Sequence, residues 1–237
     1  MLPADLTLFS HVASRPEEEL DLAQAALLIA EPEYPSLDVA RYLEAIDRLG
    51  VAARRFLDSP HHAEEPPLRR ITRFLHGQQG FHGNAQDYYD PKNSFLNEVL
   101  DRKTGIPITL AVVVVEVAHR AGVEAWGVGF PGHFLVRGRV ADRPIFIDPF
   151  NGNLLDSASL RELHQRATGQ NREPDPRLLE PVSKRAILTR MLMNLRTIYQ
   201  QRSDGERLRG VLLRLQILSP SDELDRALGK LPKRLPN

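Results

Sequence analysis

Cysteine is absent from the chain of 237 residues. Without a thiol, the protein forms no disulfide, holds no metal through thiolates and uses no thiol nucleophile. Disulfide-stapled secreted folds are thereby excluded, and the composition fits a cytoplasmic protein.

Long apolar runs are absent as well. The most apolar stretch, Ile108 to Val115, covers eight residues, whereas a membrane-spanning helix needs about 20. Residues 1–19 hold no apolar segment of the length that a signal peptide requires. We therefore expect a cytoplasmic protein with no membrane partner.

An excess of one charge is also missing. Lys and Arg together number 31, as do Asp and Glu, so the formal net charge is zero. Such a chain has no bulk field that would collect a polyanion. We expect no nucleic-acid partner, and the 42% of hydrophobic and 26% of charged residues indicate an ordinary globular protein.

The first third of the chain has helical spacing. Ser14-Arg15-Pro16-Glu17 has the pattern of a capping box and predicts a helix that runs to about Glu31. Apolar residues every three or four positions predict a second helix from about Ser36 to Asp58, and a short helix is expected to end at Gly77. The loop between them contains His61-His62, to which we assign no role.

The centre of the chain has a different character. Gly80 to Ser94 is rich in turn-forming residues, and Ser94 is expected to cap a following helix. Pro107 to Ala121 contains four consecutive valines that favour a strand, but its length without a breaker favours a helix buried on most of its surface. We predict the helix.

Three strands are expected after this helix, at about 123–129, 133–139 and 144–148. Phe130-Pro131-Gly132-His133 has the proline and glycine positions of a type II turn. A short helix from Ser157, a polar linker and two amphipathic helices follow. We therefore predict an α+β protein with an N-terminal helical region (1–79), a core (80–168), a linker (169–181) and a C-terminal helical hairpin (182–237).

The central motifs resemble a known family. The segments GNAQDYYDPKNSFLNEVLDRKTGIPITL, EVAHRAG, GVGFPGHFLVR and IDPFNG, which lie between Gly83 and Gly152, are similar to the bacterial SirB-type proteins of the transglutaminase-like superfamily. The likeness continues upstream in AALLIAEPEYPSLDVARYL and downstream in ILTRMLMNLRTIY. The resemblance implies a transglutaminase-like core followed by helices of tetratricopeptide character.

The resemblance also implies a papain-like plan for the site. In that plan a cysteine begins the central helix, a histidine begins one strand, and an aspartate on the next strand orients the imidazole. The histidine falls on His133 and the aspartate on Asp148. At the start of the helix this chain has Pro107-Ile108-Thr109, so the thiol is missing and Thr109 is the nearest hydroxyl.

Hairpin geometry supports the histidine and the aspartate independently of the resemblance. If the strands are joined by a turn of even length, Ala141-Asp142 or 140–143, paired residues have numbers that sum to 283. Asp148 then faces Leu135, and His133 lies diagonally across on the same face, about 7–8 Å away by Cα. We predict that the two side chains form a hydrogen-bonded pair beside the start of the central helix.

Each site residue also has a structural interpretation. His133 and Asp148 can be turn residues, and Thr109 in a first helical turn can satisfy a backbone N–H. The polar residues of the irregular segment either bond its own backbone or line a groove beside His133; they are Asn84, Asp87, Tyr88, Tyr89 and Asn93. Both interpretations stay open here.

A metal site is not expected. Glu116 and His119 have the Glu-x-x-His spacing of half a carboxylate-bridged site, but no second such pair occurs. We expect no cofactor. The C-terminal helix pair is too short for a repeat array, because such arrays need three or more units, and is expected to pack on the core.

Two function classes remain. The first is a non-thiol, catalytically silent transglutaminase-like protein that binds a protein or peptide. The second is a hydrolase or acyl-transfer enzyme in which His133, held by Asp148, activates Thr109 or a water. A hydroxyl within hydrogen-bonding distance of His133 in an open cleft would favour the enzyme.

Overall fold

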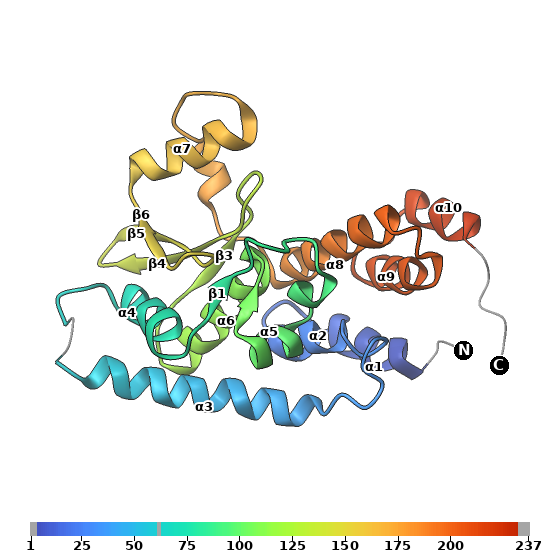
Figure 1. Cartoon of the computed structure of the whole chain (residues 1–237), viewed down its shortest axis with the longest axis horizontal. Helices are drawn as coiled ribbons and strands as arrows, with labels where there is room; N and C mark the ends of the chain where they lie inside the picture. Colours follow the sequence, from blue (N-terminus) through green and yellow to red (C-terminus); the bar gives the residue numbers. More distant parts are fainter. Residues whose placement is uncertain (1–3, 61–62, 232–237) are drawn as a thin grey trace.

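A computed structural model describes residues 4–60 and 63–231, and Figure 1 shows its course. Its α-helices are α1 (Ala4–Ala13), α2 (Leu22–Leu28), α3 (Val39–Asp58), α4 (Pro67–Arg73), α5 (Leu96–Arg102), α6 (Pro107–Arg120), α7 (Ser157–Thr168), α8 (Lys184–Gln201), α9 (Gly205–Leu218) and α10 (Asp222–Lys230). Its strands are β1 (His82–Gly83), β2 (Thr104–Gly105), β3 (Trp126–Val128), β4 (Leu135–Val140), β5 (Arg143–Asp148) and β6 (Asn153–Leu155). A π-helical turn (Phe74–Gln78) extends α4, and 3₁₀ turns occupy Pro91–Ser94 and Pro176–Leu179.

Helix α6 is the centre of the molecule. All residues from Pro107 to Ala118 are buried, and α3, α4, α8 and β4 pack around the helix. The predicted buried helix is therefore confirmed. Its four valines prefer strands locally, but packing on every side compensates for that preference because β-branched side chains fill a close-packed core well.

The main sheet is antiparallel and has the strand order β3-β4-β5-β6. In the β4–β5 hairpin, Val136 pairs with Ile147 and Val140 with Arg143, which is the predicted sum of 283. The even turn length is therefore confirmed, and of the two alternatives the structure has the two-residue turn Ala141-Asp142. Strand β6 has no counterpart among the predicted strands.

The two faces of this sheet pack against different partners. Val136 and Ile147 belong to the main core with α6. Their neighbours Leu135 and Phe146 face the opposite way and pack with Leu160 of α7 in a second, smaller cluster. In Figure 1 the sheet accordingly lies between α7 and α6, as expected when successive side chains alternate along a strand. Asp148, two residues beyond Phe146, shares the side of the sheet that faces α7.

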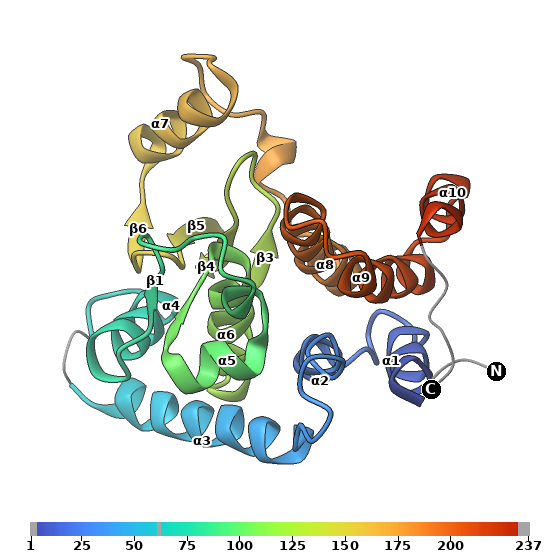
Figure 2. The same ribbon diagram turned by 45° about the vertical axis from the view of Figure 1, so that its right-hand side comes forward.

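The helical flanks pack on the same main core. Apolar residues of α2, α6 and α8 form one continuous cluster, and α1 packs against α9. Figure 2 shows α8 and α9 side by side, with α10 beyond them. The expectation that the C-terminal pair packs on the core is confirmed.

Several predicted boundaries are wrong. The capping box at Ser14 does not start a helix. The helix starts seven residues later, after Asp21, whose carboxylate accepts from Gln24 N and caps α2. Ser94 ends a 3₁₀ turn, and α5 begins after Phe95. Helices α1 and α10 were not predicted, so the C-terminal region is a hairpin followed by a third helix.

Within the described ranges, no helix combines the length and the apolar content needed to cross a bilayer. His61-His62 lie outside the described residues.

Two methionines on α8 provide a matched test of this packing. Met191 is fully buried, whereas Met193 is 40% exposed. We expect Met191→Ala to lower the free energy of unfolding by roughly 2–5 kcal/mol, because it leaves a cavity in the shared core. Met193→Ala should change it by less than about 0.5 kcal/mol. Urea unfolding followed by circular dichroism measures both, and equal losses would show that α8 does not belong to the core.

Candidate functional site

The turn before β4 sets the position of His133. His133 N donates to Phe130 O at 3.1 Å, and Gly132 has φ 65°, so the predicted type II turn is confirmed. A Cβ on Gly132 would lie 3.1 Å from the Cβ of Ala167 on α7. Both the backbone angle and the approach of α7 therefore require glycine at this position.

His133 and Asp148 form a hydrogen-bonded pair. The Nε2 atom of His133 lies 2.8 Å from Oδ1 of Asp148, and the two side chains are 17% and 7% exposed. The same Oδ1 accepts from Phe150 N at 2.9 Å, and Gly152 N donates to Asp148 O. The predicted hydrogen bond between the two side chains is confirmed, and the 148–152 turn fixes the orientation of the carboxylate.

The other nitrogen of the imidazole is available. A carboxylate accepts hydrogen bonds, so Nε2 donates in this pair, and in the neutral form of the imidazole Nδ1 then carries the lone pair. Within residues 4–60 and 63–231, no hydrogen bond engages Nδ1 of His133. This is the tautomer that a general base would need.

Thr109 does not join this pair. Its side chain is fully buried, and its Oγ1 lies 2.7 Å from Asn93 O and accepts from Ile106 N at 3.2 Å. The hydroxyl thus satisfies the backbone at the start of α6 and on the neighbouring loop. Across the described part of the chain, no hydroxyl makes a hydrogen bond to His133.

Backbone hydrogen bonds link the aspartate turn to the start of α6. Gly83 N donates to Phe150 O, and Asn84 N donates to Gly105 O, both at 2.9 Å. Strand β1 therefore lies between the 148–152 turn and the segment that leads into α6.

The candidate binding residues in the loop divide into two groups. The amide of Asn84 donates to Asn93 Oδ1 and accepts from Asp87 N, and the amide of Asn93 donates to Asp87 O. Asn93 is fully buried. These contacts hold the loop together, as the structural interpretation requires.

The tyrosines of the same loop face outward instead. Tyr88 is 40% and Tyr89 is 60% exposed. Their ring centroids are 5.4 Å apart, Tyr88 lies 6.3 Å from Phe150, and Phe150 lies 6.5 Å from His133. We call Tyr89, Tyr88 and Phe150 the aromatic row; it runs from the surface to the imidazole, and burial raises the pKa of Tyr88.

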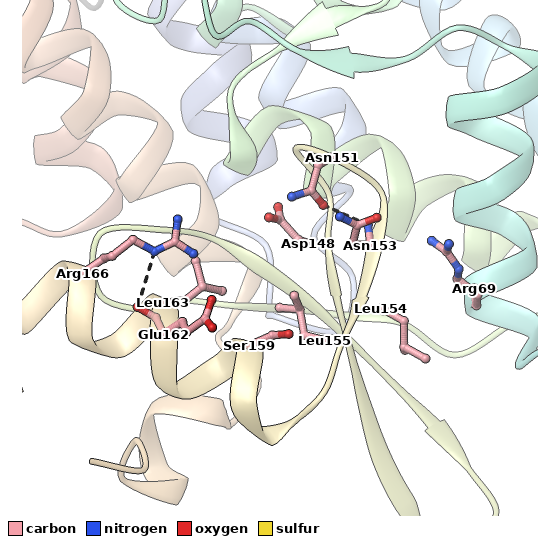
Figure 3. Close-up of a pocket in the computed structure, with 10 residues that line it drawn as sticks. All are labelled: Arg69, Asp148, Asn151, Asn153, Leu154, Leu155, Ser159, Glu162, Leu163 and Arg166. Carbon is pink, nitrogen blue, oxygen red and sulfur yellow. Dashed lines mark hydrogen bonds between the residues drawn. The ribbon is translucent and has the colours of Figure 1, made fainter. Parts of the chain in front are cut away.

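Asp148 also lines a polar pocket of about 360 Å³. Figure 3 shows Asp148 and Asn151 at the β5–β6 turn, with Glu162 and Arg166 on α7 across from them. Arg69 of α4 reaches the same turn and donates to Gly152 O. The pocket is thus lined by two carboxylates and two guanidinium groups, and Asp148 belongs both to this pocket and to the pair with His133.

His76 packs against the 148–152 turn. Gly152 has φ 75°, and a Cβ there would lie 2.9 Å from the imidazole of His76. Burial lowers the pKa of His76, while a hydrogen bond with the backbone of Pro149 acts in the opposite direction.

Arg190 connects α8 to the histidine turn. Its guanidinium donates to His133 O at 2.7 Å and to Phe130 O at 3.3 Å, and it lies over the ring of Phe134. Burial lowers the pKa of Arg190. Sequence reasoning missed this residue because it stands on the polar face of a helix that was recognised by its apolar stripe; Phe150 was missed although it lies within the IDPFNG motif.

The Glu-x-x-His pair is engaged elsewhere. Glu116 bonds Arg120 at 2.5 Å, and Nε2 of His119 lies 2.8 Å from Ala125 O. The described residues contain no group of three or more His, Asp and Glu side chains that could hold a metal ion.

Comparison with known proteins finds one matching superfamily and several bacterial relatives. The family model described as the transglutaminase-like superfamily matches residues 40–193. A UPF0162 protein of Xylella fastidiosa strain Temecula1 is 43% identical over 82% of this chain and 70% of its own length. A UPF0162 protein of Pseudomonas aeruginosa is 34% identical over 77% of this chain and 66% of its own length.

A shorter match reaches beyond bacteria. The mouse F-box only protein 21 is 43% identical over 70 residues, which are 30% of this chain and 11% of that protein. No solved structure matches the chain.

Two glycines test how the site is supported. A Cβ on Gly83 would lie 2.4 Å from the ring of Phe150, whereas one on Gly77 meets nothing within 4 Å. We expect Gly83→Ala to displace Phe150 and the Asp148 turn, lowering the free energy of unfolding by about 1–3 kcal/mol and shifting the imidazole NMR signals of His133.

Gly77→Ala is the control and should leave those signals unchanged. If Gly83→Ala also left the His133 signals and the stability unchanged, Phe150 would not be the support of the aspartate turn.

Proposed function

We propose that this chain, which belongs to the transglutaminase-like superfamily, binds a peptide or protein segment and performs no thiol chemistry. The observation that carries the proposal is that the start of α6, where the papain-like plan has its cysteine, offers no accessible nucleophile. The chain has no cysteine, and Thr109 is fully buried with its hydroxyl bonded to Asn93 O. A hydroxyl in that state neither reaches a substrate nor receives help from His133.

The surface beside His133 suits an extended peptide. The aromatic row offers exposed rings that bury large apolar area with little loss of side-chain entropy. The polar pocket beside Asp148 adds donors and acceptors of both charges. Its volume lies within the range of about 300–1,000 Å³ that ligand pockets occupy.

We extend the proposal to the finer classification. The motifs between Gly83 and Gly152 support a SirB-type branch of the superfamily, and the antiparallel α8–α9 pair supports a tetratricopeptide-like tail. On this proposal, 80–168 is the core, 1–79 is its helical cap, 169–181 is a linker and 182–237 is the tail. The absence of cysteine supports a place in the cytoplasm.

The second candidate is an enzyme that activates water. The observation that favours it is the pair itself, because Nε2 of His133 bonds Asp148 at 2.8 Å and leaves Nδ1 as an acceptor. Such an imidazole can take a proton from a water that attacks an acyl group. Thr109 has no part in this candidate.

A substrate screen distinguishes the two candidates. We expect the wild-type protein and His133→Ala to release the same background product from acyl esters and from a peptide library, because no nucleophile is positioned. Mass spectrometry of the reaction mixtures measures this. Turnover that His133→Ala reduces by tenfold or more would establish the water-activating enzyme in place of the silent binder.

Binding is tested separately with an immobilised peptide library. We expect individual peptides to bind the wild-type protein, and Tyr89→Ala to weaken those peptides roughly tenfold, because an exposed aromatic contact is lost. Val51→Ala is the control, because Val51 is an apolar side chain that is 53% exposed on α3 and lines neither pocket. A library with no saturable binder would contradict the proposal.

A further inference from the structure

A second pocket, apart from the aspartate turn, lies on α8. It has a volume of about 450 Å³ and is lined by Arg185, Thr189, Arg190 and Met193 of α8 and by Leu218 and Ser219 at the end of α9. Arg185, Thr189 and Met193 are spaced four residues apart and Arg190 follows Thr189, so these side chains share one face of the helix. We call it the α8 pocket.

Both charged side chains of the α8 pocket are cations. Arg185 donates to the carbonyls of Ala13 and Arg15, and Arg190 donates to those of Phe130 and His133. Within the described residues neither guanidinium forms a salt bridge, and no carboxylate lines the pocket. A carbonyl carries only a partial charge, so two net positive charges remain.

The opposing field is smaller. Two helix ends face the guanidinium groups, since Arg185 donates to Ala13 O at the end of α1 and the last turn of α9 lies near Leu218; together they are equivalent to roughly one negative charge. The carboxylate of Glu17, which accepts from Lys184 N, is offset by the ammonium group of Lys184. Two guanidinium groups exceed that, and the acceptors of Arg190 are backbone carbonyls and not a carboxylate. Burial also lowers the pKa of Arg190. The net positive charge of the pocket therefore favours an anionic ligand.

The rest of the lining is apolar or offers hydrogen bonds. Met193 is 40% exposed and Leu218 forms the facing wall. The hydroxyls of Thr189 and Ser219 make no hydrogen bond to any described residue. A bare inorganic anion would leave the apolar wall uncovered, whereas a carboxylate beside an aliphatic side chain would cover both parts.

We propose that the α8 pocket binds the C-terminal residue of a peptide, with the α-carboxylate on Arg185 and Arg190 and an apolar side chain against Met193 and Leu218. The inference rests on the proposed peptide-binding function and names the end of the peptide that this protein recognises. Guanidinium groups match a carboxylate with paired N–H donors.

The α8 pocket communicates with the histidine turn through one side chain. Arg190 lines the pocket and also donates to His133 O at 2.7 Å. A carboxylate that binds the remaining N–H groups of Arg190 is therefore linked through this one side chain to the backbone that positions the imidazole. We expect its binding to shift the NMR signal of the His133 amide.

The experiment is an NMR titration of the ¹⁵N-labelled chain of 237 residues with three small probes. N-acetylleucine carries the carboxylate and the apolar side chain, N-acetylleucinamide lacks the carboxylate, and acetate lacks the apolar side chain. We expect N-acetylleucine to shift the amides of residues 185–193, Ser219 and His133 saturably. The amide probe should bind at least tenfold more weakly, and acetate severalfold more weakly.

Substitutions at Thr189 isolate the charge. Thr189→Asp should weaken N-acetylleucine roughly tenfold by repulsion, while the nearly isosteric Thr189→Asn should stay within twofold of wild type. Thr197→Asp is the control on the same helix, because Thr197 is exposed and outside the pocket.

Equal binding of acid and amide, no saturable shift, or equal effects of Thr189→Asp and Thr189→Asn would each overturn the inference. These outcomes are separate from failure of the proposed function. Library peptides that bind but ignore Thr189→Asp leave peptide binding intact and remove only this site, whereas a library without binders removes the proposed function.

Discussion

Burial of α6 on all sides is the constraint on which the rest of the structure depends. A helix without a polar face has no stable position at a surface, so it must be enclosed by other elements. Here α3 covers one side, the sheet another, and α8 closes the assembly from the C-terminal end of the chain. The helical cap, sheet and tail therefore share one core, and the site lies where their edges meet.

This enclosure explains why the hydroxyl of Thr109, at the start of α6, is not accessible to a substrate. Thr109 lies under a loop whose carbonyl at Asn93 accepts a hydrogen bond from its hydroxyl, and a Cβ at Gly105 would approach its Oγ1 to 2.8 Å. The same backbone packing holds Asp148, because its buried carboxylate needs the donors from Phe150 and His133 to offset desolvation. The histidine–aspartate pair is thus stable as structure, with or without a reaction to perform.

Local patterns predicted those parts of the fold that short-range geometry determines. Chain length without a breaker identified α6, and the parity of the β4–β5 turn placed His133 and Asp148 on one face. The bond from Ile106 N to Thr109 Oγ1 is of the kind that the sequence predicts for a first helical turn. The contact with Asn93 could not be predicted, because it spans sixteen positions and depends on how a loop folds over the helix.

Other misses had a signal that the patterns did not use. In α10, Ser221 accepts from Leu224 N and acidic residues fill the first turn, which is a recognisable helix start. Arg190 had none, since a lone arginine on a polar helix face is ordinary until the Phe130–His133 turn packs beside it.

The two-residue turn of the β4–β5 hairpin limits how the family can vary in length. One inserted residue at Ala141-Asp142, without a compensating bulge, would rotate every later side chain of β5 to the opposite face. Ile147 would then leave the main core, and the carboxylate of Asp148 would turn away from His133 toward α6. We therefore expect an insertion in this turn to preserve the histidine–aspartate pair only when it adds an even number of residues.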